Sequence, residues 1–125
     1  MGLVAAAPTA SADTDMFTSP SGNIGCMMDF DYVRCDIDER NWTPPPRPAD
    51  CAPQTGYGQG ITLPVNGRAQ FVCGGDSAMG AGWVLPYGQF HAGGGLSCKS
   101  ETTGMRCSNS DGHGFMLSRE SYSLF

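Results

Sequence analysis

The stretch IGCMMDFDYVRCDI, residues 24–37, determines the fold class that this chain predicts. A second stretch, LSCKSETTGMRCSN at residues 96–109, repeats its spacing, with eight residues between the two cysteines and an arginine directly before the second one. If the two cysteines of a copy lie opposite each other on antiparallel strands, side-chain alternation gives the first copy one apolar and one mostly polar face. A register shift of one residue would mix these faces. Each copy therefore predicts a β-hairpin crossed by a disulfide.

The same register assigns the remaining pairs of each hairpin. The polar face of the first hairpin, which carries Arg34, Asp36 and Asp38, is expected to be solvated. The inward face of the second hairpin is less apolar, so we expect this copy to lie nearer the edge of a sheet. The facing pairs should be Ile24 with Ile37, Met28 with Val33, Leu96 with Asn109, and Ser100 with Met105.

The first twelve residues are expected to lie outside the fold. Residues 2–7 are a short apolar run, and Ala10-Ser11-Ala12 has the small residues of a signal-peptidase site, with cleavage before Asp13. A basic region before the run is absent, so the segment is interpreted as the end of a signal peptide, with a flexible alanine-rich terminus as the alternative. We predict a residual signal peptide at 1–12 and a single all-β domain at 13–125, secreted to the extracellular space or the cell envelope.

The cysteine count supports this localisation. An even number of cysteines in a small exported chain favours disulfides over free thiols. Because no CxxC spacing is present and histidine occurs only twice, no metal or cofactor is expected. The six cysteines predict bridges between Cys26 and Cys35, between Cys98 and Cys107, and by elimination between Cys51 and Cys73.

Short elements joined by turns fill the rest of the chain, which contains 18 glycines and 9 prolines. Asn66-Gly67 is typical of a hairpin turn, and residues 119–125 could form a helical turn capped by Ser118. The proline run at 44–48 is interpreted as a stiff connector, with a docking motif as the alternative. We predict a small disulfide-stapled β-sandwich or β-barrel of about seven or eight short antiparallel strands. Besides the two hairpins, strands are expected at 61–63, 69–73, 83–85 and 114–118.

Charge and hydropathy exclude two classes of partner. The net charge is −5, and the seven lysines and arginines are not clustered. Nucleic acid and anionic membranes are therefore not expected as partners. No segment is long enough to span a membrane. The oligomeric state is left open.

Three motifs contain residue types that occur in catalytic or metal sites. Residues 73–77, CGGDS, resemble the nucleophile segment of chymotrypsin-like proteases, but both histidines follow the serine and the chain is too short for a double barrel. Asp111-Gly112-His113 exposes an imidazole that Asp111 or Arg119 could tune, with a tight turn as the alternative. An acidic cluster suits a solvated strand face better than a calcium site. Its members are Asp29, Asp31, Asp36, Asp38 and Glu39.

Aromatic side chains gather in the loop-rich middle of the chain. Exposed rings such as those of Trp42 and Tyr87 would suit a sugar or protein surface, although at least half of these aromatics are expected in the core. The candidate ligand-binding residues are Asp111, His113, Arg119, Trp42 and Tyr87, and no catalytic residue is assigned.

Several motifs together resemble a family of small secreted, cysteine-rich proteins of mycobacteria and other actinobacteria. They are FTSPSGNIGC at 17–26, VRCDI at 33–37, CGGD at 73–76, LPYG at 85–88 and GHGFMLSR at 112–119. The resemblance covers residues 17–125. The family is a domain of unknown function, so the resemblance implies an exported protein and no particular activity.

The leading functional hypothesis is a non-enzymatic binding or interaction module of the cell envelope or extracellular space. Its partner would be a protein or a cell-wall glycan. The alternative is an inhibitor of an extracellular hydrolase, such as a protease or lysozyme, because a pre-ordered loop binds at low entropic cost. A third hypothesis is a small hydrolase that uses His113 with Asp111 or Asp76.

Overall fold

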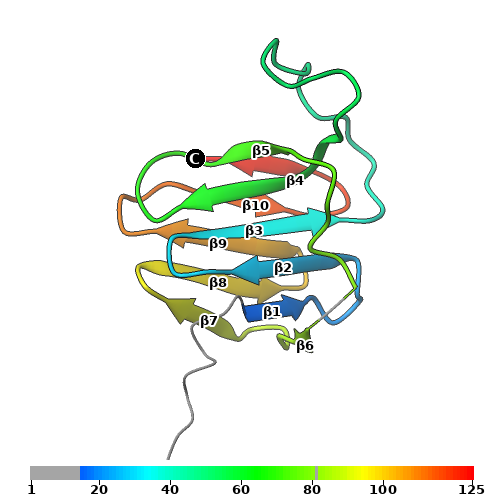
Figure 1. Ribbon diagram of the computed structural model, residues 1–125. Helices are drawn as coiled ribbons and strands as arrows, with labels where there is room; N and C mark the ends of the chain where they lie inside the picture. The colour runs from blue at the N-terminus through cyan, green and yellow to red at the C-terminus, as the bar shows by residue number, and fades with distance from the viewer. Residues whose placement is uncertain (1–14, 81) are drawn as a thin grey trace, which may run out of the picture.

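The chain folds into a sandwich of two β-sheets, seen in a computed structural model that describes residues 15–80 and 82–125 (Figure 1). The first sheet has six strands in the order β5-β4-β3-β2-β1-β6, and the second has five in the order β11-β10-β9-β8-β7. The strands are β1 (Asp15–Thr18), β2 (Ile24–Met28), β3 (Tyr32–Ile37), β4 (Tyr57–Pro64), β5 (Gln70–Cys73), β6 (Trp83–Val84), β7 (Phe90–Gly93), β8 (Leu96–Glu101), β9 (Gly104–Asn109), β10 (Gly114–Leu117) and β11 (Tyr122–Leu124). The all-β prediction is confirmed.

The two sheets repeat one topology. Strands β1 to β5 form an antiparallel meander in chain order, and strands β7 to β11 form a second one. The two cysteine hairpins are β2–β3 and β8–β9, which occupy corresponding places in the two meanders. The repeated cysteine spacing therefore marks a repeat of the whole five-strand unit.

Both hairpins have the register that the cysteine spacing predicts. Every expected facing pair is present, and all three predicted disulfides are formed. β3 and β9 face each other across the core, where Cys35 Sγ lies 3.9 Å from Cys107 Sγ. These sulfurs lie at the centre of a cluster of buried apolar side chains from both sheets. The alternation of period two thus places both disulfides inside the sandwich.

Four expectations about the strands are wrong. The described residues form eleven strands, more than seven or eight, because the sequence did not indicate the short strands β1, β7 and β11. β6 is parallel to β1, whereas only antiparallel pairs were expected. The second cysteine hairpin lies in the middle of its sheet, because β7 covers one side of it and β10 the other. The C-terminal residues form β11, which pairs with β10, instead of a helical turn.

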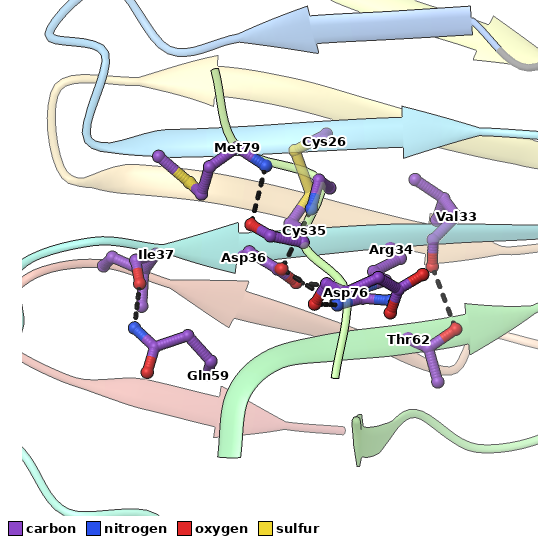
Figure 2. Close-up of polar contacts among 12 residues, drawn as sticks. Cys26, Val33, Arg34, Cys35, Asp36, Ile37, Gln59, Thr62, Asp76 and Met79 are labelled. Atoms are coloured by element: carbon purple, nitrogen blue, oxygen red, sulfur yellow. Dashed lines mark hydrogen bonds and ion pairs between the residues drawn. A yellow bond between two sulfur atoms is a disulfide. The ribbon is translucent and has the colours of Figure 1, made fainter. Parts of the chain in front are cut away.

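The outer face of the first hairpin is covered by the segment 74–80, and this corrects the prediction of a solvated face. Asp36 is fully buried and Arg34 is 8% exposed. Arg34 donates from Nε and Nη2 to both Asp36 carboxylate oxygens, at 2.9 and 3.0 Å. It also donates to the Asp76 carboxylate at 2.9 Å and to the Asp76 carbonyl at 2.8 Å (Figure 2). The Ala78 amide donates to Asp36 Oδ2 at 3.0 Å. The segment is therefore bound to β3 through both Asp76 and Ala78.

These contacts explain two further features of the first sheet. The hydrogen bond to Asp36 raises the pKa of Arg34 above its usual value, and the hydrogen bond from Arg34 lowers the pKa of Asp76. A Cβ on Gly25 would lie 2.7 Å from the Ala78 carbonyl oxygen, so the close approach of the segment requires glycine there. The CGGDS string therefore has a structural role as a cover for β2 and β3.

Residues 1–12, the predicted signal peptide, lie outside the described part of the chain. No helix within the described residues is long and apolar enough to cross a membrane.

Candidate functional site

A polar cleft of about 430 Å³ lies at one end of the sandwich, where turns of both sheets meet. The first sheet contributes the β1–β2 turn and the residues after β3, and the second contributes the β8–β9 and β10–β11 turns. Two of the predicted ligand-binding residues, Tyr87 and Arg119, line it together. The full lining is Ser19, Ser21, Gly22, Asn23, Ile24, Asp38, Glu39, Tyr87, Glu101, Thr102, Thr103, Gly104, Ser118, Arg119 and Glu120.

Hydrogen bonds fix the wall of the cleft that belongs to the first sheet. The Asn23 side chain donates to the Glu39 carbonyl at 3.0 Å and accepts from the Glu39 amide at 2.8 Å. Glu39 Oε1 lies 3.2 Å from Arg119 Nη2, so an exposed ion pair connects this wall to the second sheet. The Asn41 amide adds a bond to the Arg119 carbonyl at 2.7 Å. The relative position of the two walls is therefore set by the backbone as well as by side chains.

Tyr87 is held at the rim by a tight turn. The Gln89 amide donates to the Pro86 carbonyl at 3.1 Å, and Gly88 has a φ of 87°. Glycine at the third position of such a turn permits this left-handed conformation. The Gly88 amide donates to the Ser100 carbonyl at 2.7 Å and so attaches the turn to β8. The Tyr87 side chain is 47% exposed, so its ring is available to a ligand.

The cleft carries an excess of negative charge and many groups that donate or accept hydrogen bonds. Its four carboxylates are offset by a single cation, Arg119. Serine and threonine hydroxyls and the Asn23 amide supply both donors and acceptors. Such a surface repels anions and can bind the hydroxyl groups of a neutral ligand.

Trp42 packs next to the cleft and holds the turn that carries Arg119. It is half-buried and packs against Tyr122 and Phe71, with ring centroids 4.6 and 6.0 Å away. Its indole nitrogen donates to the Ser118 carbonyl at 2.8 Å, directly before Arg119. Trp42 is a candidate ligand-binding residue, and the structure places it against the turn with Arg119 and outside the lining of the cleft.

Asp111 and His113 lie at the other end of the sandwich, because the β9–β10 turn and the β8–β9 turn are at opposite ends of β9. Asp111 Oδ2 accepts from the Gly67 amide at 2.8 Å, and His113 Nδ1 lies 3.4 Å from the Phe125 carbonyl. Asp76 contacts Arg34 on the first sheet. Among the described residues, no hydrogen bond joins His113 to either aspartate, so the structure does not assemble the set that the hydrolase hypothesis requires.

The model of a family of unknown function, DUF6636, matches residues 1–125. The chain belongs to the DUF6636 family. Searches of curated proteins and of solved structures found no match. The predicted resemblance to a family without known function is confirmed, whereas secretion and actinobacterial origin stay predictions.

The DUF6636 chain also contains a cluster that the sequence did not indicate. His91 Nε2 lies 2.6 Å from Asp15 Oδ2, and Trp83 Nε1 donates to Asp15 Oδ1 at 3.1 Å. The His91 ring packs edge-on against Trp83 and against the buried Phe17. The three polar residues come from β1, β6 and β7, which are at the same edge of the two sheets (Figure 1).

One signal could have pointed to this cluster. His91 lies opposite Cys98 in the register of β7, so its ring occupies a position on the inner face of the second sheet. A histidine on an inner face needs a polar partner. Asp15 supplies it, and the pair joins the edges of the two sheets.

Proposed function

We propose that this protein is an exported, non-enzymatic binding module of the cell envelope or extracellular space, and that it binds a neutral glycan in the polar cleft. The observation that carries the proposal is the cleft of about 430 Å³ between turns of both sheets, with Tyr87 exposed at its rim. The three disulfides support the exported location, because such bonds persist in oxidising compartments.

The chemistry of the lining favours a sugar over other small ligands. Sugars present hydroxyl groups in several directions, and the cleft offers carboxylates, hydroxyls, an amide and a guanidinium to them. A tyrosine ring combines an apolar face, on which a sugar ring can stack, with a polar hydroxyl. The excess of carboxylates disfavours anionic ligands, so a neutral glycan fits best.

The experiment is a titration of isotope-labelled protein with neutral oligosaccharides derived from chitin, cellulose and arabinan, followed by amide chemical shifts. We expect shifts at residues 19, 21–23, 87–88, 101–104 and 118–120, which are the residues with a backbone amide in the turns around the cleft. Tyr87→Ala should weaken binding by roughly tenfold, because truncating the aromatic side chain on which the sugar ring stacks removes much of the binding energy. Arg68→Ala, at an exposed position on the β4–β5 turn, is the control. Shifts confined to other surfaces, or equal affinity in both variants, would contradict a glycan site in the cleft.

A second candidate function, inhibition of an extracellular hydrolase, is favoured by the segment between β3 and β4. Figure 1 shows this segment extending away from the two sheets. Arg47 Nη1 donates to the carbonyls of Ala52 and Thr55, at 2.9 and 2.6 Å, and the Cys51–Cys73 disulfide anchors the loop to β5. A projecting loop that is already ordered suits insertion into the active site of another protein.

This second candidate is tested against a panel of extracellular proteases and lysozymes. Inhibition should weaken in Arg47→Ala, because that change releases the loop carbonyls, and it should not change in Tyr87→Ala. Unchanged hydrolase rates throughout the panel would reject it. Within the described residues, no hydrogen bond or ion pair joins His113 to an aspartate, and this supports the non-enzymatic assignment over a hydrolase that uses His113.

A further inference from the structure

The outer faces of the two sheets differ at the residue that lies opposite an equivalent arginine. Arg34 and Arg106 are equivalent, because each directly precedes the second cysteine of its hairpin. Across the strand pair, Arg34 faces Met27, whereas Arg106 faces Lys99. The two hairpins thus have the same register, but the second one places two cations opposite each other on neighbouring strands.

In the first sheet, the outer face binds an extended segment of the chain itself. The extended segment 74–80 lies on β2 and β3, and its Asp76 provides both a carboxylate and a carbonyl to Arg34, at 2.9 and 2.8 Å. The contact is a charge-assisted recognition of an acidic segment by an arginine on a sheet face.

Within residues 15–80 and 82–125, no segment makes a corresponding contact with Arg106 on the second sheet. Lys99 and Arg106 form no ion pair with any carboxylate of the described residues. Each is instead next to an exposed aromatic ring: Lys99 Nζ lies 5.3 Å from the centre of Phe90, and Arg106 Cζ lies 4.3 Å from the centre of Phe125. Phe90 is 64% exposed. We name these four residues the cation–aromatic face.

This arrangement is unfavourable for the isolated protein. Like charges directly opposite each other on neighbouring strands destabilise a sheet. Their attraction to the aromatic rings offsets part of this cost but leaves the donors of both cations free to bind a ligand. In a chain with a net charge of −5, an unneutralised pair of cations is a local exception. Arginine and aromatic residues on a flat surface are also typical of protein interfaces.

We propose that the cation–aromatic face binds an acidic polypeptide segment of another protein, as the first sheet binds its own segment 74–80. The carboxylates of the segment would contact Lys99 and Arg106, and its apolar atoms would pack on Phe90 and Phe125. This site is separate from the polar cleft, since none of its four residues lines that cleft.

The probe is a short fluorescein-labelled peptide of alternating aspartate and leucine, and binding is followed by fluorescence anisotropy at low and at physiological salt. Lys99→Glu and Arg106→Glu should each weaken binding by roughly tenfold or more, because each turns an attraction into a repulsion. Arg68→Glu changes the net charge equally at an exposed site elsewhere and should leave binding unchanged. Tyr87→Ala, a cleft variant, should also bind the peptide normally, which separates this proposal from the glycan site.

Controls distinguish the class of ligand. A peptide with asparagine in place of aspartate should not bind, and dextran sulfate should bind more weakly than the acidic peptide. The proposal is overturned if no binding occurs at low salt, or if Arg68→Glu weakens binding as much as Arg106→Glu. Tighter binding of dextran sulfate that depends on Lys99 and Arg106 would also overturn it, because the face would then select an anionic polysaccharide.

Discussion

The two cysteine hairpins have the same register and bury an equivalent disulfide on the inner face, yet their outer faces have opposite properties. In the first, Arg34 is buried with Asp36 beneath the segment 74–80. In the second, Arg106 is exposed, and Ser108 stands where Asp36 would be. The inner half of each hairpin therefore builds the core, whereas the outer halves of the two hairpins differ in sequence and in exposure. We therefore expect a functional difference between the two hairpins to lie on their outer faces.

The largest expected effect comes from removing the buried partner of Arg34. Asp36→Ala would leave a buried guanidinium without its main carboxylate and the Ala78 amide without an acceptor. We expect the free energy of unfolding to fall by about 3 kcal/mol. Ser108→Ala, the equivalent change in the second hairpin, should cost no more than about 0.5 kcal/mol. Urea denaturation of both variants measures the difference, and equal losses would show that the covered face is not special.

A smaller effect is expected from filling the space beneath the covering segment. A Cβ on Gly25 would lie 2.7 Å from the Ala78 carbonyl oxygen and 2.9 Å from Met79 Cα, both backbone atoms. Gly25→Ala should therefore displace the segment and lower the unfolding free energy by about 1–3 kcal/mol. Ser97 occupies the equivalent place in the second hairpin, so Ser97→Ala is the control and should be nearly neutral. Thermal melting of the pair tests this; a neutral Gly25→Ala would mean that the segment is loosely attached.

The cysteine spacing allowed the core to be predicted, because side-chain alternation and hairpin pairing involve residues that are close in sequence. The register and all three disulfides followed from it. The burial of Asp36 could not be predicted, because it depends on Asp76 and Ala78, about forty residues away. Glycines at 25 and 60 were the available signal, since Gly25 leaves room for the Ala78 carbonyl and Gly60 leaves room for the Asp36 carboxylate.

The candidate site was only partly predictable for the same reason. Tyr87 and Arg119 were selected as exposed or charged loop residues, and the structure brings them into one cleft. The sequence could not show that Trp42 would pack against Tyr122, or that Asp111 and His113 would lie at the opposite end. Which turns meet at an end of a sandwich depends on how the two sheets stack, and a period-two pattern does not contain that information.

The covered face should also respond to acid. The hydrogen bond from Arg34 lowers the pKa of Asp76 from its ordinary value of 3.8, so the pair stabilises the fold fully above that pH and loses its effect as the pH falls through the lowered pKa. Asp76→Asn should therefore reduce the loss of stability between neutral pH and pH values below 3.8. Urea denaturation across this range measures it. Glu120→Gln, at an exposed position in the β10–β11 turn, is the control; the same change in acid sensitivity there would assign the effect to general charge.

The smallest expected effect concerns the open face and has the opposite sign. Lys99→Glu replaces a like-charged cross-strand pair with an ion pair to Arg106, so the free energy of unfolding should rise by about 0.2–1 kcal/mol. In the first hairpin the corresponding change, Met27→Glu, places a carboxylate beside an arginine that Asp36 and Asp76 already neutralise, and it should not stabilise. Thermal melting at low salt detects the gain, which should shrink at high salt. If Lys99→Glu stabilises the protein while it abolishes binding of the acidic peptide, the cation pair is maintained for recognition at the expense of stability. A loss of stability would mean instead that Lys99 supports the fold through its contact with Phe90.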